Sequence, residues 1–390
     1  MKRNKVCLLF IALVLIATYH CGWKMPLPGV RSTPESFGAN DTLYTRLNPA
    51  WDASQLGYFP ANPMVPVDIA IGDDGYLFIA DSANNRVITV SPAGHLITSG
   101  NMNTIEPIDN PVGIDIDSKL NLLIVNGTNT IYVWNQYINH GGVDSVLEEL
   151  TEDMHFIFSA DAEKIDSVLH LHPFYVDENE ASKFQGVAFG PARDNTVFVT
   201  DKENNRIIKL NLALSGAVKL KNGTIHPTIM GVYEKDIATY GSGAGTVDNP
   251  RGITADDDGN VYFTQVGGNF LVQKLKKQGS SYISGYTLYV DPIMDLEQFS
   301  APNDIALGKN NAIFVLETGS GIVTKFYNQG SLAGHPVNLG KKGLSQAVFN
   351  RPLGIAISDE EIVYILDTGN KRIERYQFSV SEGDLPVEQP

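Results

Sequence analysis

The chain has 390 residues, which is enough for one large all-β domain or two average domains. Of these residues 43% are hydrophobic and 19% charged, as in an ordinary globular protein. Its formal net charge is −15, which argues against nucleic-acid binding because that affinity depends largely on Lys and Arg. Both cysteines, Cys7 and Cys21, lie in the first 21 residues, which excludes a disulfide within the rest of the chain.

The first residues are typical of an export signal. Basic residues precede an apolar run from Val6 to Ala17, which is too short to span a bilayer comfortably. Residues 1–20 resemble a bacterial lipoprotein signal, and Cys21 stands where the lipidated cysteine would be. Tyr19 and His20 depart from the usual pattern of small residues, so a plain signal peptide or an uncleaved anchor is the alternative. The resemblance implies lipidation of Cys21, a membrane anchor and a location in the cell envelope.

Residues 21–48 are rich in Pro, Gly, Ser and Thr with little periodicity, and we expect them to form a flexible tether. Six copies of one pattern follow. Each copy begins with Pro-x-Gly/Asp-Ile and continues as three runs of alternating apolar residues separated by turns, which predicts β-strands. The copies occupy residues 65–90, 110–134, 183–210, 249–275, 301–327 and 351–378.

The spacing within the copies is strict. In five of them the opening proline and the polar residue that ends the second run are 15 residues apart, as in Pro66 and Asp81. The third copy has Phe184 in the proline position and Asp201 17 residues later, because its first turn is longer. Chance composition does not produce such agreement, so the copies are interpreted as one structural unit repeated.

These repeats resemble NHL repeats, which implies an all-β, six-bladed β-propeller in which each repeat forms one four-stranded antiparallel blade. We expect the propeller to span residues 49–380 and a disordered tail to span residues 381–390. The last copy ends at its third strand near Phe378, so the stretch around Leu47–Tyr58 is expected to supply the fourth strand. An insertion near residues 136–182 should contain the outer strand of the second blade, and it could form either a functional protrusion or an acidic solvated loop.

The motif Asp-x-x-Asn-Asn-Arg recurs in two copies and, as a variant, in a third. We interpret its Asp as an acceptor for turn amides and its Arg as a donor to a neighbouring strand or blade. Because the pair recurs at equivalent positions, we expect it to be structural. The three pairs are Asp81 with Arg86, Asp201 with Arg206, and Asp367 with Arg372.

The start of the innermost strand is the best candidate for a ligand site. Four copies have Gly there, whereas two have Asp68 and Asp304, and Asn303 stands beside Asp304. The Pro-Asn-Asp run is similar to residues that hold a metal ion in gluconolactonase-like propellers, so Ca²⁺ or a cationic ligand is a candidate occupant. The alternative is that the two carboxylates cap backbone amides.

Catalytic residues are not predicted. The histidines of amidating-lyase and streptogramin-lyase propellers have no counterpart in the six repeat cores, and the sequence has no Ser-His-Asp order, phosphate loop or CxxC motif. The leading hypothesis is therefore a non-catalytic, envelope-anchored scaffold without a cofactor that binds a protein, a peptide or a small molecule. The alternative is a metal-dependent hydrolase or lyase that uses Asp68, Asn303 and Asp304 at the mouth of the channel.

Overall fold

The structure is a computed structural model that describes part of the chain. The described residues are 44–57, 63–97, 107–135, 155–156, 170–219, 225–287, 291–294, 296, 298–326, 337–339 and 349–378. The signal segment, Cys21, most of the tether, residues 136–154 and 157–169 of the insertion, and the C-terminal tail therefore lie outside the description. No helix among the described residues has the length and hydropathy needed to cross a membrane.

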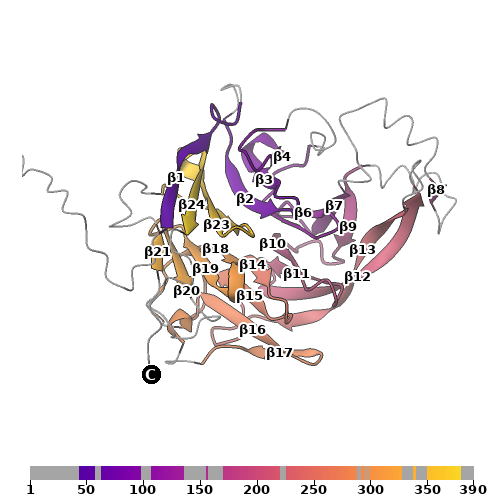
Figure 1. The fold of residues 1–390 in the computed structure, drawn as a ribbon. Helices are drawn as coiled ribbons and strands as arrows, with labels where there is room; N and C mark the ends of the chain where they lie inside the picture. Colours follow the sequence, from indigo (N-terminus) through magenta and orange to yellow (C-terminus); the bar gives the residue numbers. More distant parts are fainter. Residues whose placement is uncertain are drawn as a thin grey trace, which may run out of the picture. The chain divides into compact units, whose positions relative to one another are not determined.

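The described strands form six antiparallel sheets around a common axis, which confirms the predicted six-bladed propeller (Figure 1). From the axis outward, the first three blades contain β2 (Pro66–Ile71), β3 (Leu77–Asp81) and β4 (Arg86–Val90); β5 (Gly113–Ile116), β6 (Asn121–Val125), β7 (Thr130–Asn135) and β9 (His172–Val176); and β10 (Phe184–Phe189), β11 (Thr196–Asp201), β12 (Arg206–Lys219) and β13 (Ile225–Ala238).

The other three blades contain β14 (Pro250–Ala255), β15 (Val261–Gln265), β16 (Val272–Gln278) and β17 (Ser281–Ser284); β18 (Pro302–Leu307), β19 (Ile313–Glu317), β20 (Ile322–Phe326) and β21 (Val337–Leu339); and β22 (Gly354–Ile357), β23 (Ile362–Asp367), β24 (Arg372–Phe378) and β1 (Tyr44–Asp52). Short 3-10 helices connect some strands, namely η2 (Ser82–Asn84), η3 (Pro292–Met294), η4 (Lys309–Asn311) and η6 (Thr368–Asn370).

The 15-residue spacing has a direct structural cause. The opening proline of the inner strand pairs across the ladder with the polar residue that ends the second strand, as in Pro66 with Asp81 and Pro302 with Glu317. In the third blade the same pairing joins Phe184 to Asp201. The spacing is therefore the length of one β-hairpin measured between its two paired ends.

The N-terminal strand closes the ring, which confirms the expected completion of the last blade. β1 runs antiparallel to β24, with Tyr44 opposite Phe378 and Asp52 opposite Arg372. The strand begins at Tyr44, so residues 44–48 belong to the sheet and not to the tether. Tyr44 and Trp51 explain the earlier start, because they are only 1% and 4% exposed and burying them anchors the strand at both ends.

The core is divided among the junctions between blades. The described residues form six apolar clusters, one for each pair of adjacent blades. In β3, Leu77 and Ile79 pack toward the sixth blade, whereas Phe78 and Ala80 pack toward the second. Successive residues of a middle strand therefore face two different buried junctions, which explains why the middle strands are buried along nearly their whole length.

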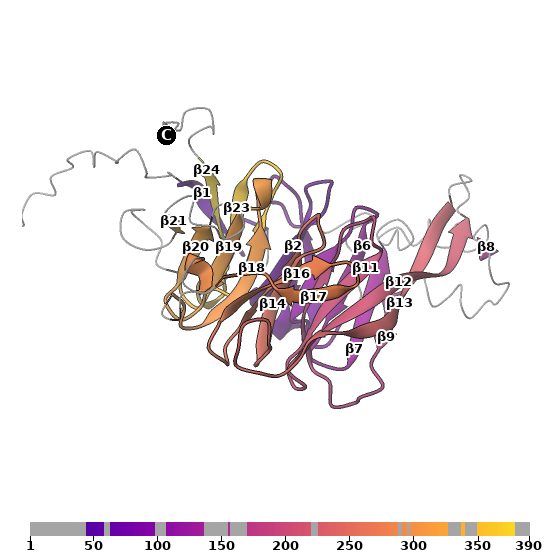
Figure 2. The same ribbon diagram turned by 90° about the horizontal axis from the view of Figure 1, so that it is seen from below.

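Two strands of the third blade are much longer than the rest. β12 and β13 have 14 residues each and continue beyond the ring as a two-stranded ribbon (Figure 2). β8 (His155–Phe156), which belongs to the insertion, pairs with β12 at Val218 and Lys219. β9, at the other end of the insertion, forms the outer strand of the second blade, as expected.

Candidate functional site

A cavity of about 200 Å³ lies on the propeller axis and is lined by the inner strands. The first ring of its lining is the residue that follows the proline position in each blade. In blade order these residues are Val67, Val112, Gln185, Arg251, Asn303 and Leu353. Blades three, four and five thus contribute a contiguous polar arc, and blades six, one and two contribute a contiguous apolar arc. The mouth of the channel is therefore amphipathic across its diameter.

The next residue along each strand forms a second ring, in which the predicted carboxylates lie. Asp68 and Asp304 both line the cavity, although their blades are separated by the sixth blade. The two Oδ atoms of Asp68 accept the amides of Ile69 and of Ile114 in the second blade, at 2.9 and 2.7 Å. Asp304 does the same with Ile305 and with Ile355 of the sixth blade, both at 2.8 Å. Each carboxylate therefore joins its own inner strand to the next one.

A third carboxylate, Asp115, lies in the same cavity and was missed by the sequence analysis. It is two residues further along β5, where other blades have Ala70, Ala306 or Ala356. Its Oδ2 accepts the amide of Phe189 in the third blade at 2.7 Å. The sequence could have revealed Asp115, because it is the one carboxylate at a position where the other inner strands have a small residue.

Burial changes the ionisation of all three carboxylates. Desolvation raises the pKa of Asp304 and of Asp115 to about 7, against amide hydrogen bonds that lower it. The pKa of Asp68 is raised well above its usual value by desolvation and then by the charge of Asp304. The channel should therefore hold protons near neutral pH that the same residues release in the unfolded chain.

The Asp115→Asn variant tests this ionisation. Because the native pKa is raised, the carboxylate destabilises the fold progressively as pH rises from about 4 through 7, whereas Asn carries no charge. We expect the unfolding free energy of the variant, relative to the wild type, to rise by about 2–3 kcal/mol between pH 5 and pH 8. Urea unfolding at the two pH values measures it, and a difference that stays constant with pH would contradict it.

Asn303, the third predicted ligand, is also engaged. Its Nδ2 donates to the carbonyl of Leu353 in the next blade at 2.6 Å. Within the described ranges no three His, Cys, Asp or Glu side chains are grouped so that they could hold a metal ion. Gln185 and Arg251 lie with Asn303 at the mouth of the channel.

In the third and fourth blades, whose inner strands begin with Gly, threonines of the second strand make the equivalent connections. Thr200 Oγ1 accepts the Gly186 amide at 2.7 Å and donates to the Arg251 carbonyl at 2.9 Å. Thr264 donates to the Asn303 carbonyl at 2.9 Å. Glycine is needed at this position because the next strand approaches closely: a Cβ on Gly252 would lie 2.8 Å from the Cα of Asp304.

The Asp–Arg pairs lie in the turns between the second and third strands. Arg86, Arg206 and Arg372 donate from Nε to the Asp five residues earlier, at 2.8, 2.9 and 2.9 Å. The first Asn of the motif also donates to this Asp, as Asn84 does to Asp81 at 2.9 Å. The other oxygen of each Asp accepts an amide from the segment that enters the same blade, and these amides belong to Val65, Lys183 and Asn350.

The second Asn of the motif explains why the motif takes this form. Asn85 and Asn205 have φ of 52° and 50°, a left-handed conformation that Asn tolerates well. Their side-chain oxygens accept the amides of Asn110 and Asn249, at 2.9 and 2.7 Å, where the chain enters the next blade. In blades that lack the pair, Gln265 and Glu317 still accept amides from their own entering segments.

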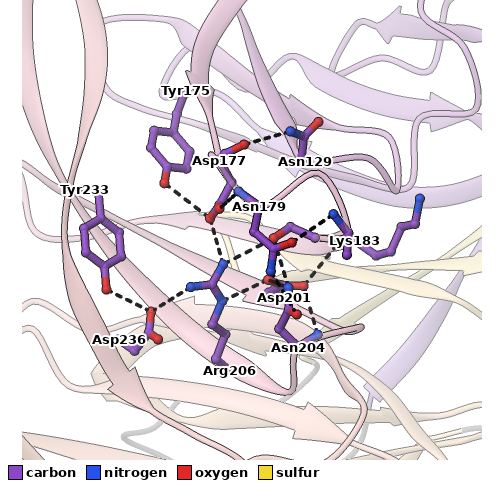
Figure 3. Close-up of polar contacts among 12 residues, drawn as sticks. Asn129, Tyr175, Asp177, Asn179, Lys183, Asp201, Asn204, Arg206, Tyr233 and Asp236 are labelled. Carbon is purple, nitrogen blue, oxygen red and sulfur yellow. Dashed lines mark hydrogen bonds and ion pairs between the residues drawn. The ribbon is translucent and has the colours of Figure 1, made fainter.

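Arg206 differs from the other two arginines because it joins three elements (Figure 3). Its guanidinium lies 2.9 Å from Asp201, 2.8 Å from Asp177 after β9, and 3.4 Å from Asp236 on β13. Although burial opposes ionisation, hydrogen bonds from Asn204, from the Lys183 amide and from Arg206 hold the pKa of Asp201 below its usual range. This group, the Arg206 cluster, fastens the outer strand of the second blade to the third blade.

Comparisons with known proteins agree with this architecture. No protein-family model matches the chain. A probable peptidyl-alpha-hydroxyglycine alpha-amidating lyase of Caenorhabditis elegans is 29% identical over 144 residues, which cover 36% of this chain and 41% of that protein. Human teneurin-4 is 23% identical over 220 residues, which cover 49% of this chain and 8% of teneurin-4. The matched segments thus span less than half of either relative.

These findings support a six-bladed propeller of the NHL type. Solved structures give the same fold. A protein of unknown function from Bacteroides thetaiotaomicron is 15% identical with a TM-score of 0.51, over 86% of this chain and 76% of that one. A gluconolactonase from Xanthomonas campestris is 11% identical with a TM-score of 0.50, over 86% of this chain and 97% of that one.

Proposed function

We propose that this propeller is a non-catalytic scaffold that binds a small molecule, a peptide or part of a protein at the mouth of its channel. The hydrogen bonding of Asp68 and Asp304 supports this proposal most directly. Each carboxylate already accepts two backbone amides at 2.7–2.9 Å, so the two strongest candidates for metal ligation or acid–base chemistry join blades. The side chains that remain available to contact a ligand are those of the first ring.

A thermal-shift screen of metabolites and short peptides on the purified full-length chain tests this function. A ligand that binds only the native state at about 100 times its Kd adds about 2.7 kcal/mol of stability. We expect a binder to stabilise the wild type but not Gln185→Trp, because the larger side chain narrows the mouth. The Gln185 side chain donates no hydrogen bond to any described residue, so the variant should still fold, which circular dichroism checks.

The fate of the bound molecule separates binding from catalysis. We expect nuclear magnetic resonance to recover it unchanged after long incubation with the protein. Turnover that Gln185→Trp abolishes would overturn the non-catalytic assignment, and stabilisation that the variant retains for every binder would overturn the site.

A metal-dependent hydrolase or lyase is the second candidate. One sequence relative bears the name of a lyase, and Asp68, Asn303 and Asp304 line one cavity. In this case Ca²⁺ should raise the melting temperature of the wild type, and Asp68→Asn combined with Asp304→Asn should abolish the rise. If the carboxylates act only as amide acceptors, the double variant should lose the same stability with or without Ca²⁺.

We also propose that the scaffold is exported and anchored in the cell envelope through lipid on Cys21. The proposal depends on the apolar run before Cys21 and on the Pro- and Gly-rich stretch after it. A single acyl chain binds membranes only marginally, so stable anchoring needs more than one chain. Metabolic labelling with a radioactive fatty acid should mark the wild type and not Cys21→Ser, and equal labelling of the two would contradict the anchor.

A further inference from the structure

Arg251 is the charged member of the first ring. It lines the cavity, and its carbonyl accepts the Thr200 hydroxyl at 2.9 Å, which fixes its backbone against the third blade. Its Nε is buried without a hydrogen-bond partner, and no carboxylate of the described residues forms an ion pair with it. Burial lowers the pKa of Arg251. A buried N–H group without an acceptor is costly, so a ligand that offers an acceptor to this Nε would stabilise the site.

Lys202 places a second cation near Arg251. It lies in the turn after β11, where its amide donates to the Lys183 carbonyl at 2.9 Å. Thr200, two residues before Lys202, bonds to the Arg251 carbonyl, so the two cations belong to adjoining segments. Burial and then the charge of Arg251 lower the pKa of Lys202, whereas the charge of Glu203 raises it. Within the described part of the chain, neither cation forms an ion pair, in a protein whose net charge is −15. An anion between them would relieve the repulsion and supply acceptors.

The other residues of the first ring indicate the chemical character of the rest of the ligand. Arg251 belongs to the fourth blade, so across a ring of six it faces Val67 of the first blade, with Val112 and Leu353 on either side. A ligand with a charged head at Arg251 therefore has an apolar surface opposite its head. The cavity of about 200 Å³ suits a short chain rather than a large ring system.

We propose that the channel mouth binds a small aliphatic carboxylate, with Arg251 holding the carboxylate, Lys202 adding positive charge beside the mouth and the apolar arc contacting the alkyl group. The planar fork of Arg matches a carboxylate in two parallel hydrogen bonds. A phosphate dianion fits less well, because the burial that raises the pKa of Asp68 and of Asp304 just inside the mouth also disfavours a second charge there. This inference rests on the proposed function, since it names the ligand class of the same site.

Isothermal titration of the purified full-length chain with sodium hexanoate, hexylamine and 1-hexanol tests the assignment. Hexanoate should bind, and the amine and the alcohol, which have the same alkyl chain, should bind at least tenfold more weakly. Arg251→Leu should weaken hexanoate at least tenfold and leave hexanol within about threefold. Lys202→Gln should weaken hexanoate severalfold. Arg193→Leu is the matched control, because Arg193 is exposed outside the cavity, and it should change nothing.

Other outcomes would overturn the assignment. These are no binding of hexanoate by the wild type up to 50 mM, equal binding of hexanoate by Arg251→Leu, or tighter binding of hexylamine than of hexanoate. If Arg251→Leu does not fold, Arg251→Lys keeps the charge but loses the fork, and it should still weaken hexanoate severalfold. A ligand whose binding is abolished by Gln185→Trp but unchanged by Arg251→Leu would support the proposed function. It would contradict only the assignment of a carboxylate as the ligand.

Discussion

Replacing Arg206 with methionine is expected to lower the free energy of unfolding by about 3–5 kcal/mol, because breaking a buried ion pair leaves the partner carboxylates buried without a counter-charge. The side chains of Asp201 and Asp177 are 0% and 8% exposed, and both lie within 2.9 Å of the guanidinium. Methionine keeps much of the apolar stem but removes every donor. Urea unfolding followed by circular dichroism measures the loss.

An exposed arginine of the same blade provides the control. Arg193 lies 3.8 Å from Asp258, and their side chains are 64% and 74% exposed, so Arg193→Met should cost less than about 1 kcal/mol. Adding Asp177→Asn and Asp201→Asn to Arg206→Met should restore part of the stability, because no charge then remains buried without a partner. Equal losses in Arg206→Met and Arg193→Met would show that the Arg206 cluster does not hold the blades together.

Deleting residues 22–58 is expected to prevent stable folding, or to lower the melting temperature by more than about 15 °C. The deletion removes β1 and with it Tyr44, Trp51 and Leu56, which are 1%, 4% and 2% exposed. Loss of one buried aromatic side chain costs about 3–5 kcal/mol, and a whole domain has only about 5–15 kcal/mol of stability. It also exposes the edge of β24 that β1 covers.

A shorter deletion distinguishes the strand from the tether. Removing residues 22–40 leaves β1 in place and should change the melting temperature by less than about 2 °C. The single variant Trp51→Ala should fall between the two, because Trp51 packs against Tyr364 and the guanidinium of Arg375. Equal melting of the two truncated chains would mean that β1 does not stabilise the sixth blade.

The strands, their order and the closure of the ring could be predicted because each depends on short-range periodicity repeated six times. The pairing of Pro66 with Asp81 is a property of one hairpin, so its spacing is visible in one copy and checked by the others. The missing partner of β24 could be predicted by counting strands. The start of β1 at Tyr44 could not, because the boundary depends on packing against Phe314 and Tyr376 of other strands.

The candidate site was only partly predictable, because a site on the axis depends on residues that are far apart in the sequence. The sequence placed Asp68 and Asp304 at the channel but not the amides of Ile114 and Ile355, which lie 46 and 51 residues away. The contact between Arg206 and Asp177, 29 residues apart, depends on where the insertion returns to the second blade. The amphipathic character of the mouth could have been predicted from the residue after each opening proline position, taken in the order of the blades around the ring.

The hydrogen bonds between inner strands bear on how such a ring can evolve. At each junction a side chain of one blade bonds to the backbone of the next: Asp68, Asp115 and Asp304 accept amides, whereas Thr200, Thr264 and Thr368 donate to carbonyls. In every case the partner on the next blade is a main-chain group, which each repeat has whatever its sequence. A duplicated or transplanted blade therefore brings its own donor or acceptor for this bond and needs only the main chain of its neighbour to form it, so these positions could diverge one at a time while the ring remained closed.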